Sequence, residues 1–352
     1  MFDLASSNKK MFILKYYLNP YCSIVYSGTG DSNLRVVDDV LKLIGDTPMV
    51  KLKSVRKSTG AGVYVKLEYL NPSGSLKDRI ALEMVRKAEA DGKLKPGYTI
   101  VEASTGNTGI SLSFVGLHLG YKVVIYMPEG MTQERIKIMK SYGAEVCLVK
   151  PGDLKALEKG VAGAEVEIPT RMMCLERERS DPKVWWARQF QNPANTEAHI
   201  KTGREILRQL DGKVDAFAAS IGTGGTLLGI AKALKDELPN VKVIGIEPAS
   251  AKYPIVSGYK KVPGAGEEVS GGIVAELFDS GLIDEFVSVT NDDAVDMANR
   301  LLSEEGLFTG VSAGANVLVA CRVSKRLGGN KRVATVLPDS RDRYLTEMKY
   351  TT

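Results

Sequence analysis

One lysine stands where its amine could take part in chemistry. Lys77 follows a turn of small residues, 73–75, and precedes apolar residues spaced as in a helix from Ile80 to Ala88. A lysine held at the mouth of a site can form a Schiff base with a carbonyl compound, pyridoxal phosphate above all. Most lysines between a turn and a helix are simply solvated, so this interpretation depends on further motifs.

A second stretch of small and polar residues, 104–109, follows a strand expected to end at Glu102 and precedes another helical pattern. A hydroxyl-rich turn at the start of a helix presents N–H and O–H donors to an anion. Plain capping of the helix would need only one Ser or Thr, and this loop holds Ser104, Thr105 and Thr108. The excess indicates a small carboxylate ligand.

A third loop, Gly222-Thr223-Gly224-Gly225-Thr226, again lies between an expected strand and an expected helix. Its glycines allow close approach of a ligand, and its amides suit a phosphate. It is neither a P-loop nor a complete dinucleotide fingerprint, although Glu247 could imitate the acid that binds a ribose. A tight turn alone would account for one or two of the three glycines.

A fourth loop, Gly310 to Ala315, contains Ser312 and also precedes a helical pattern, although its small residues could serve packing alone. Four such loops with one lysine meet the needs of pyridoxal phosphate. That cofactor requires an amine, a phosphate cradle, a partner for the ring nitrogen and a pocket for the substrate carboxylate.

Composition excludes several other classes of protein. The 352 residues carry a net charge of +5 without a dense basic run, which argues against nucleic acid as a ligand. No apolar run approaches the roughly 20 residues of a membrane span, and no signal peptide is evident, so we expect a cytoplasmic protein. The four cysteines lack metal-ligand spacing and are expected to be reduced and mostly buried. With two histidines, neither a catalytic triad nor a metal site is expected.

The elements that must position these loops alternate along the chain. Apolar runs predict strands, and amphipathic stretches between them predict helices, which is typical of parallel sheets covered on both faces. The sequence therefore predicts an α/β fold with two parallel-sheet domains, in which ligands bind beyond the carboxyl ends of the strands. Residues 1–44 are expected to form an extension. The segment 151–183 has no clear period and is interpreted as an insertion or a solvated helix. The expected strands are 62–67, 98–102, 122–127, 145–149, 216–219, 241–246 and 332–337, and the expected helices are 80–92, 108–119, 132–142, 202–211, 226–237, 292–305 and 314–327.

Eight motifs occur along residues 43–346: GDTPM (45–49), SGSLKDR (73–79), STGNTG (104–109), MPE (127–129), QFQNPAN (189–195), GTGGT (222–226), SAG (312–314) and LPDS (337–340). With these motifs the chain resembles the cysteine synthase and cystathionine β-synthase family of fold type II pyridoxal phosphate enzymes. The resemblance implies two open twisted parallel-sheet domains with the cofactor site between them. The N-terminal domain, 67–185, would carry the lysine and the carboxylate loop, and the C-terminal domain, 45–66 with 186–346, would carry the phosphate loop.

The resemblance also implies a role for each motif residue. Lys77 would be the Schiff-base lysine and the proton shuttle, Asn107 would contact the ring hydroxyl, and Ser312 would face the ring nitrogen. The phosphate would lie on Gly222, Thr223, Gly224, Gly225 and Thr226. The substrate carboxylate would be bound by Ser104, Thr105, Gly106, Thr108 and Gln189.

The expected activity is a transferase reaction of cysteine biosynthesis, a β-replacement in which sulfide attacks O-acetylserine or O-phosphoserine. A neutral serine at the ring nitrogen would favour loss of a β leaving group over transamination. The expected assembly is a homodimer, and whether a serine acetyltransferase binds it stays open. Arg204 and Arg341 stand where the family has neutral residues, and either could receive the phosphate of O-phosphoserine if it lines the site.

Other functions stay open at this point. Within the same fold, the chain could be a cystathionine β-synthase that joins serine to homocysteine, or another β-replacement enzyme that makes a diamino acid. A non-catalytic binding protein is disfavoured because Lys77 and Asn107 are present. A nicotinamide-dependent dehydrogenase is disfavoured because the glycine fingerprint is incomplete.

Overall fold

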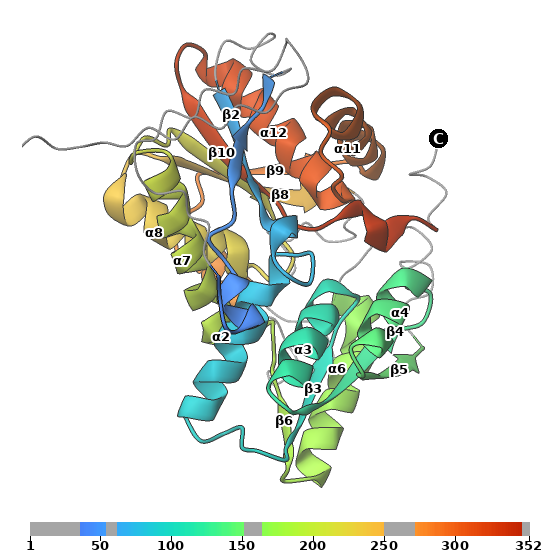
Figure 1. The fold of residues 1–352 in the computed structure, drawn as a ribbon. Helices are drawn as coiled ribbons and strands as arrows, with labels where there is room; N and C mark the ends of the chain where they lie inside the picture. Colours follow the sequence, from blue (N-terminus) through green and yellow to red (C-terminus); the bar gives the residue numbers. More distant parts are fainter. Residues whose placement is uncertain (1–35, 54–61, 151–163, 250–271, 347–352) are drawn as a thin grey trace, which may run out of the picture. The chain divides into compact units, whose positions relative to one another are not determined.

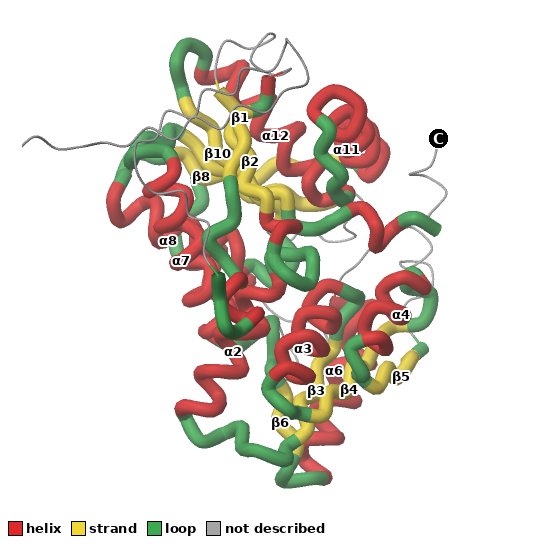
Figure 2. Tube along the Cα trace, viewed as in Figure 1, coloured by secondary structure: helices red, strands yellow, loops and turns green. Residues whose placement is uncertain are grey.

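Parallel strands form two separate sheets in the computed structural model, which describes residues 36–53, 62–150, 164–249 and 272–346. Both sheets belong to one compact unit that begins at Asp38 (Figures 1 and 2). Of the expected extension 1–44, residues 1–35 lie outside the described part. Val40–Leu43 already form a 3₁₀ turn, η1, and bury Leu41 in the first hydrophobic core.

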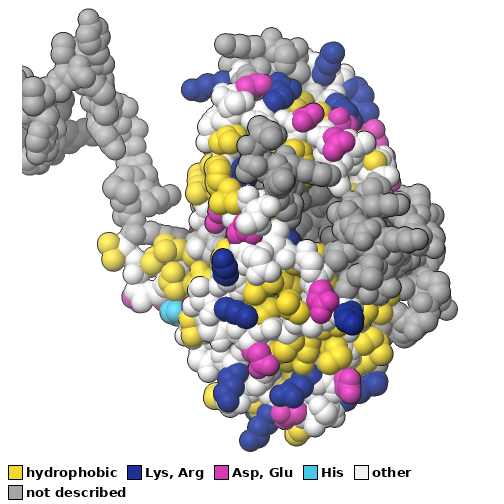
Figure 3. All heavy atoms as spheres, turned by 90° about the vertical axis from the view of Figure 1, so that its right-hand side faces the viewer, with side chains coloured by type: hydrophobic (Ala, Val, Ile, Leu, Met, Phe, Trp, Pro, Cys, Tyr) yellow, Lys and Arg dark blue, Asp and Glu magenta, His cyan; other side chains and the backbone are white. Residues whose placement is uncertain are grey.

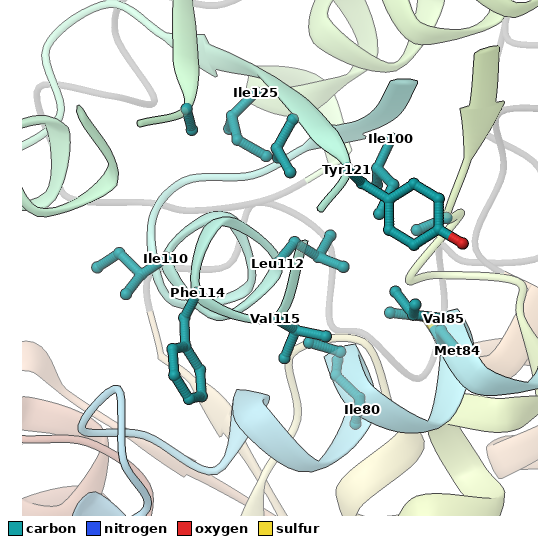
Figure 4. Packing of buried hydrophobic residues seen from close by; sticks show 14 of the residues in the cluster. Ile80, Met84, Val85, Ile100, Ile110, Leu112, Phe114, Val115, Tyr121 and Ile125 are labelled. Atoms are coloured by element: carbon teal, nitrogen blue, oxygen red, sulfur yellow. The ribbon is translucent and has the colours of Figure 1, made fainter. Parts of the chain in front are cut away.

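The smaller sheet has the strand order β5-β4-β3-β6, and every neighbouring pair is parallel. Alternate residues of β3 and β4 point to opposite faces, because the side-chain period of a strand is two. One face buries Ile100 and Ile125 against helices α2, α3 and α4 (Figure 4). The other face buries Val101 and Val124 against Cys174 and Leu175 of α6. The elements are α2 (Lys77–Ala90), β3 (Thr99–Ala103), α3 (Asn107–His118), β4 (Lys122–Pro128), α4 (Gln133–Ser141), β5 (Glu145–Val149), α6 (Ala164–Ser180) and β6 (Val184–Trp186).

The interpretation of 151–183 as an insertion or a solvated helix is therefore wrong for its described half. Residues 151–163 lie outside the described part, but α6 packs on the sheet and buries Cys174 and Leu175. Its buried face also includes Thr170 and Arg171. Polar residues on the buried face interrupt the apolar period that would have predicted this packing.

The larger sheet has the order β1-β2-β10-β7-β8-β9, and all of its pairs are parallel except the edge pair β1 with β2. Helices α11 and α12 cover one face, and α7, α8 and α10 cover the other. The elements are β1 (Met49–Lys51), β2 (Gly62–Leu67), η2 (Glu68–Leu70), α7 (Pro193–Gln209), β7 (Ala216–Ser220), α8 (Gly225–Glu237), β8 (Lys242–Pro248), α10 (Gly272–Asp279), β9 (Glu285–Val289), α11 (Asn291–Glu305), α12 (Val311–Leu327), β10 (Arg332–Leu337) and η4 (Arg341–Tyr344).

The α/β fold with two mainly parallel sheets agrees with the prediction from the sequence. Helix α7 begins at Pro193, nine residues before the expected start, and the antiparallel strand β1 was not predicted. Of the cysteines within the described residues, Cys174 is buried, whereas Cys147 and Cys321 are partly exposed, so only one matches the expected burial. Cys22 lies outside the described part.

The described residues lack the features of a membrane-spanning helix and of a metal-ion cluster. Within the described ranges, no helix combines the length and apolar character needed to cross a bilayer. The same residues contain no cluster of three or more His, Cys, Asp and Glu arranged for a metal ion. On the face shown in Figure 3, basic and acidic side chains are interspersed.

Candidate active site

Lys77 is the first residue of α2, so it lies in the helix and not in the turn before it. The turn is fixed by Asp78, which accepts hydrogen bonds from the backbone N–H of Ser73 at 2.7 Å and from Ser111 Oγ at 2.6 Å. Gly74 has φ +88°, a left-handed conformation that glycine adopts without strain. The backbone N–H of Leu76 donates to Pro338 O at 2.8 Å, which ties the turn to the end of β10.

The Lys77 side chain is half-buried, and its electrostatic surroundings favour an amine that can lose its proton. Burial lowers the pKa of Lys77 from 10.5 to about 8, although the charges of Asp339 and Glu167 act in the opposite direction. Asp339 follows β10, and Glu167 lies in α6. The lysine therefore faces groups from both sheets.

The expected carboxylate loop, 104–109, lies directly after β3 and leads into α3. Ser104 Oγ accepts the backbone N–H of Gly106 at 3.1 Å and that of Gly109 at 3.0 Å, so its hydroxyl oxygen shapes the loop. Gly106 leaves no room for a side chain, because an added Cβ would lie 2.4 Å from Arg135 Cδ. Thr105 hydrogen-bonds the side chain of Glu167.

Thr108 and Gln189 are paired with each other in this structure. Thr108 Oγ1 donates to Gln189 Oε1 at 2.6 Å, and Gln189 Nε2 donates to Ala103 O at 2.8 Å. Beneath them, buried Glu102 accepts the backbone N–H of Gln189 at 2.9 Å and Trp186 Nε1 at 3.0 Å. Burial raises the pKa of Glu102 to about 7 against these donors. These contacts place Gln189 beside the loop.

The expected phosphate loop joins β7 to α8. Gly224 caps α8 with φ +87°, and Gly225 approaches Asn195 so closely that an added Cβ would lie 2.1 Å from Asn195 Oδ1. Asn195 Nδ2 donates to Thr223 Oγ1 at 3.0 Å. Apart from its chain neighbours, no described atom lies within 4 Å of the position where a Cβ of Gly222 would be, so no described side chain fills this end of the loop.

The polar half of α7 supports the phosphate loop from behind. His199 is buried, and its Nε2 lies 3.1 Å from Thr226 Oγ1. Burial and the charges of Lys77 and Arg79 lower the pKa of His199 well below its usual value, so the ring is neutral. Because Lys77 acts on a histidine that contacts Thr226, the lysine and the phosphate loop belong to one electrostatic environment.

Ser312 lies in the first turn of α12 with an exposed side chain. The backbone N–H of Gly310, which caps this helix, donates to Asp339 O at 3.1 Å. Gly314 serves packing, since an added Cβ would lie 1.9 Å from Ala294 O of α11. The cap of α12 is thus tied to Asp339, and no side-chain hydrogen bond of Ser312 is found among the described residues.

The two arginines considered for a phosphorylated substrate have different surroundings. Arg341 is buried and donates to Asn299 of α11. Arg204 is exposed on α7, where it lines a groove of about 910 Å³ with Arg208 and Lys232. No residue of that groove belongs to the expected site, which argues against Arg204 as the phosphate-binding residue, and the role of Arg341 stays a prediction.

Two buried carboxylates, Glu167 and Asp339, have no role that the sequence predicts. Glu167 could not be found from its surroundings, because α6 shows no clear period. Asp339 lies within the LPDS motif, which was recognised only as a mark of the family. The role of Arg343 was also not predicted. Its buried guanidinium donates to Gly74 O at 2.5 Å and also to Ser73 O, and these two hydrogen bonds hold the turn before Lys77.

The geometry fits pyridoxal phosphate on observations that are independent of the motifs. Asn107 Oδ1 is buried and has no hydrogen-bond partner among the described residues. No described side chain fills the phosphate loop at Gly222, and the loop offers backbone amides at the start of α8. Lys77 supplies an amine of lowered pKa. Together these groups meet the polar demands of an aldehyde cofactor that carries a phosphate.

A pH dependence follows from the environment of Lys77. Since its pKa is lowered to about 8, the fraction of neutral amine rises as pH increases and levels off above about 8. We expect the rate at which the cofactor-free protein captures pyridoxal phosphate to follow the same curve, measured by stopped-flow absorbance. If the rate instead kept rising with pH up to about 10.5, the ordinary pKa of a lysine, the lowered pKa of Lys77 would be contradicted.

Comparison with known proteins identifies the family. A family model described as pyridoxal-phosphate dependent enzyme matches residues 40–339. A cysteine synthase of Staphylococcus aureus is 44% identical over 316 residues, which cover 89% of this chain and 97% of that protein.

Solved structures agree with this match. A cysteine synthase of Entamoeba histolytica has a TM-score of 0.78 at 32% identity and covers 92% of this chain and 94% of its own. A hydrogen sulfide-producing enzyme of Fusobacterium nucleatum has a TM-score of 0.76 at 36% identity, and the match covers 88% of this chain and 100% of that chain. With the site geometry and these matches, the chain belongs to the family of pyridoxal-phosphate dependent enzymes.

Proposed function

We propose that this enzyme is a cysteine synthase, which replaces the β substituent of an activated serine with sulfide to give L-cysteine. The observation that carries the proposal is the 44% identity to the Staphylococcus aureus cysteine synthase over nearly the full length of both chains. The convergence of Lys77, Asn107 and the loops at 104–109 and 222–226 supports it.

Each part of the site has a defined task in this reaction. Pyridoxal phosphate, when bound, withdraws electrons from the substrate Cα and so acidifies its hydrogen. Lys77 would hold the cofactor covalently, and its free amine, with a pKa of about 8, would take the proton from Cα near neutral pH. The loop 222–226 would bind the phosphate, and Ser312 would face the ring nitrogen.

The carboxylate loop orients the substrate for that proton transfer. Gly106 and the hydroxyl of Thr105 lie at the start of α3, where backbone N–H groups favour an anion. Because Thr108 and Gln189 are paired with each other, a substrate carboxylate would have to replace that 2.6 Å hydrogen bond or share it. Ser104 would contribute by holding the loop in shape.

The proposal extends to organisation. The smaller sheet would correspond to a domain of residues 67–185, and the larger sheet to 45–66 with 186–346. The enzyme would act as a homodimer in the cytoplasm.

The experiment that tests the function uses the holoenzyme with three donors and two acceptors. O-acetylserine or O-phosphoserine with sulfide should give L-cysteine, measured by chromatography, whereas serine should react much more slowly because hydroxide is a poorer leaving group. Because Arg204 lies in a groove that contains no residue of the expected site and Arg341 is buried against α11, we expect no strong preference for O-phosphoserine.

Each outcome has a defined meaning. If serine and homocysteine react and sulfide does not, the enzyme is a cystathionine β-synthase and the proposal is wrong. If no donor is turned over although the cofactor is bound, the chain is not a β-replacement enzyme.

A further inference from the structure

Asp339 lies where three of the cofactor loops meet. Its backbone pairs with Ser75 in an isolated bridge beside the turn that carries Lys77. Its carbonyl oxygen accepts the N–H of Gly310, which caps α12, at 3.1 Å, and the hydroxyl of Thr309 at 3.0 Å. Its side chain reaches Asn107 at the start of α3. Asp339 therefore contacts the turn before Lys77, the cap of α12 and the start of α3.

The carboxylate of Asp339 is buried, with 1% of the residue exposed, and it is held on one side only. Oδ2 accepts Asn107 Nδ2 at 2.7 Å and the hydroxyl of Tyr344 at 2.5 Å. Oδ1 is buried without a hydrogen-bond partner among the described residues. It occupies the space that a side chain at Gly310 would need, because a Cβ there would lie 2.3 Å from it.

The charge of Asp339 decides which end of the Asn107 amide faces it. If the amide turned over, its oxygen would stand 2.7 Å from a carboxylate oxygen, which is also an acceptor. The nitrogen must therefore face Asp339. An amide nitrogen carries two hydrogens, so one remains after the first is donated to Asp339.

We propose that Asp339 is a positioning residue for the cofactor, which fixes the Asn107 amide so that its second N–H stays available to the ring hydroxyl. This inference rests on the proposed function only in requiring that pyridoxal phosphate binds. It needs no particular donor or acceptor substrate. Asp339 itself acts through Asn107 and touches no reacting atom.

The first test measures cofactor affinity by absorbance titration of the cofactor-free protein. In Asp339→Asn the carboxylate is replaced by an amide that can pair with Asn107 in two orientations, so we expect roughly tenfold weaker binding. In Asp339→Ala the partner is lost, and the loss of a charged hydrogen bond corresponds to roughly 10- to 100-fold. The bound cofactor should also absorb at a shifted wavelength in both variants.

The matched control is Asp284→Asn, directly before β9 of the larger sheet. Asp284 also accepts a backbone N–H, from Val243 at 2.9 Å, and an ion pair from Lys235 at 2.8 Å, but it contacts no part of the site. This variant should bind the cofactor as the unmodified protein does. Wild-type affinity and absorbance in Asp339→Asn would overturn the proposal.

A reciprocal exchange separates positioning from a merely structural hydrogen bond. Asn107→Asp places two carboxylates together and should lower the thermal unfolding temperature of the cofactor-free protein. Adding Asp339→Asn restores an N–H to oxygen pair between the two positions and should recover that temperature. Cofactor affinity should stay low, because residue 107 no longer offers an N–H.

Recovery of cofactor affinity in the double variant would overturn the proposal.

A third readout is the pH at which Lys77 captures the cofactor. Asp339 and Glu167 raise the pKa of this lysine, and neutral His199 adds no charge, so Asp339→Asn should shift the capture curve to lower pH. An unshifted curve would mean that Asp339 does not act on this site.

Discussion

Replacing Lys77 with alanine should reduce turnover by about 10³-fold or more while the protein stays folded. The charge of Asp339 acts on this amine, and Asp339 in turn contacts Asn107 at the start of α3. General base catalysis alone contributes roughly 10²- to 10⁴-fold, and covalent attachment of the cofactor is lost as well. Alanine has the highest helix propensity, so α2 should still begin at this position.

The measurement is steady-state cysteine formation together with the visible absorbance of the bound cofactor and the circular dichroism of the protein. The control is Lys87→Ala on the same helix, whose exposed side chain pairs with Glu197 at 3.0 Å. That variant should keep its turnover. If Lys77→Ala retained normal turnover and the absorbance of a covalently attached cofactor, another amine would have to be the attachment point.

The sequence predicted the loops of the site because their signals are local. Small and hydroxyl-bearing residues between a strand and a helix identify a turn at which backbone groups are exposed, and this holds for 104–109 and 222–226. The strands expected at 62–67 and 122–127, observed as β2 and β4, were predicted because both faces are buried and the apolar runs are nearly continuous.

The parts that were missed depend on buried polar residues. The first half of α7 buries Asn195, Thr196 and His199, so hydrophobic periodicity detected only its second half. In α6, Glu167 and Arg171 form a 2.9 Å ion pair within the buried face. A pattern of apolar residues cannot register burial that depends on pairing between polar groups.

The role of Asp339 could not be predicted because its partner is distant in sequence. Asn107 and Asp339 are 232 positions apart, and only the folded chain brings them within 2.7 Å. The role of the motif at 45–49 also depends on contacts that only the folded chain makes. Its hydroxyl, Thr47 Oγ1, donates to Glu68 Oε1 at 2.7 Å and not to a cofactor loop. The motif belongs to a buried ion cluster that anchors α2.

That cluster leads to the second large expected effect. Arg79, two residues after Lys77, donates to Glu68 of η2 at 2.7 and 2.8 Å and to Glu205 of α7 at 2.6 and 2.8 Å. Lys66 of β2 pairs with Glu205 at 2.7 Å. All four side chains are buried. Removing one partner from a buried ion cluster leaves uncompensated charge and costs about 3–5 kcal/mol.

Arg79→Leu should therefore lower the free energy of unfolding at neutral pH by about 3–5 kcal/mol, measured by urea denaturation. Burial raises the pKa values of Glu68 and Glu205, but the charge of Arg79 outweighs it and holds both below their usual value. In the native protein these carboxylates thus contribute stability above their unfolded pKa, and it is lost as pH falls through the folded value.

The variant should show the opposite dependence on pH. Without Arg79, burial raises the pKa of at least one of the two carboxylates, because Lys66 remains as their only cation within the cluster. Protonation at mildly acidic pH then removes the uncompensated charge, so the difference from the native protein should shrink as pH falls. Arg300→Leu is the matched control, since Arg300 forms an exposed pair with Glu304 on α11 and should cost only about 0–1 kcal/mol. Equal losses in the two variants, or a loss in Arg79→Leu that is independent of pH, would show that the cluster does not anchor α2 through its charges.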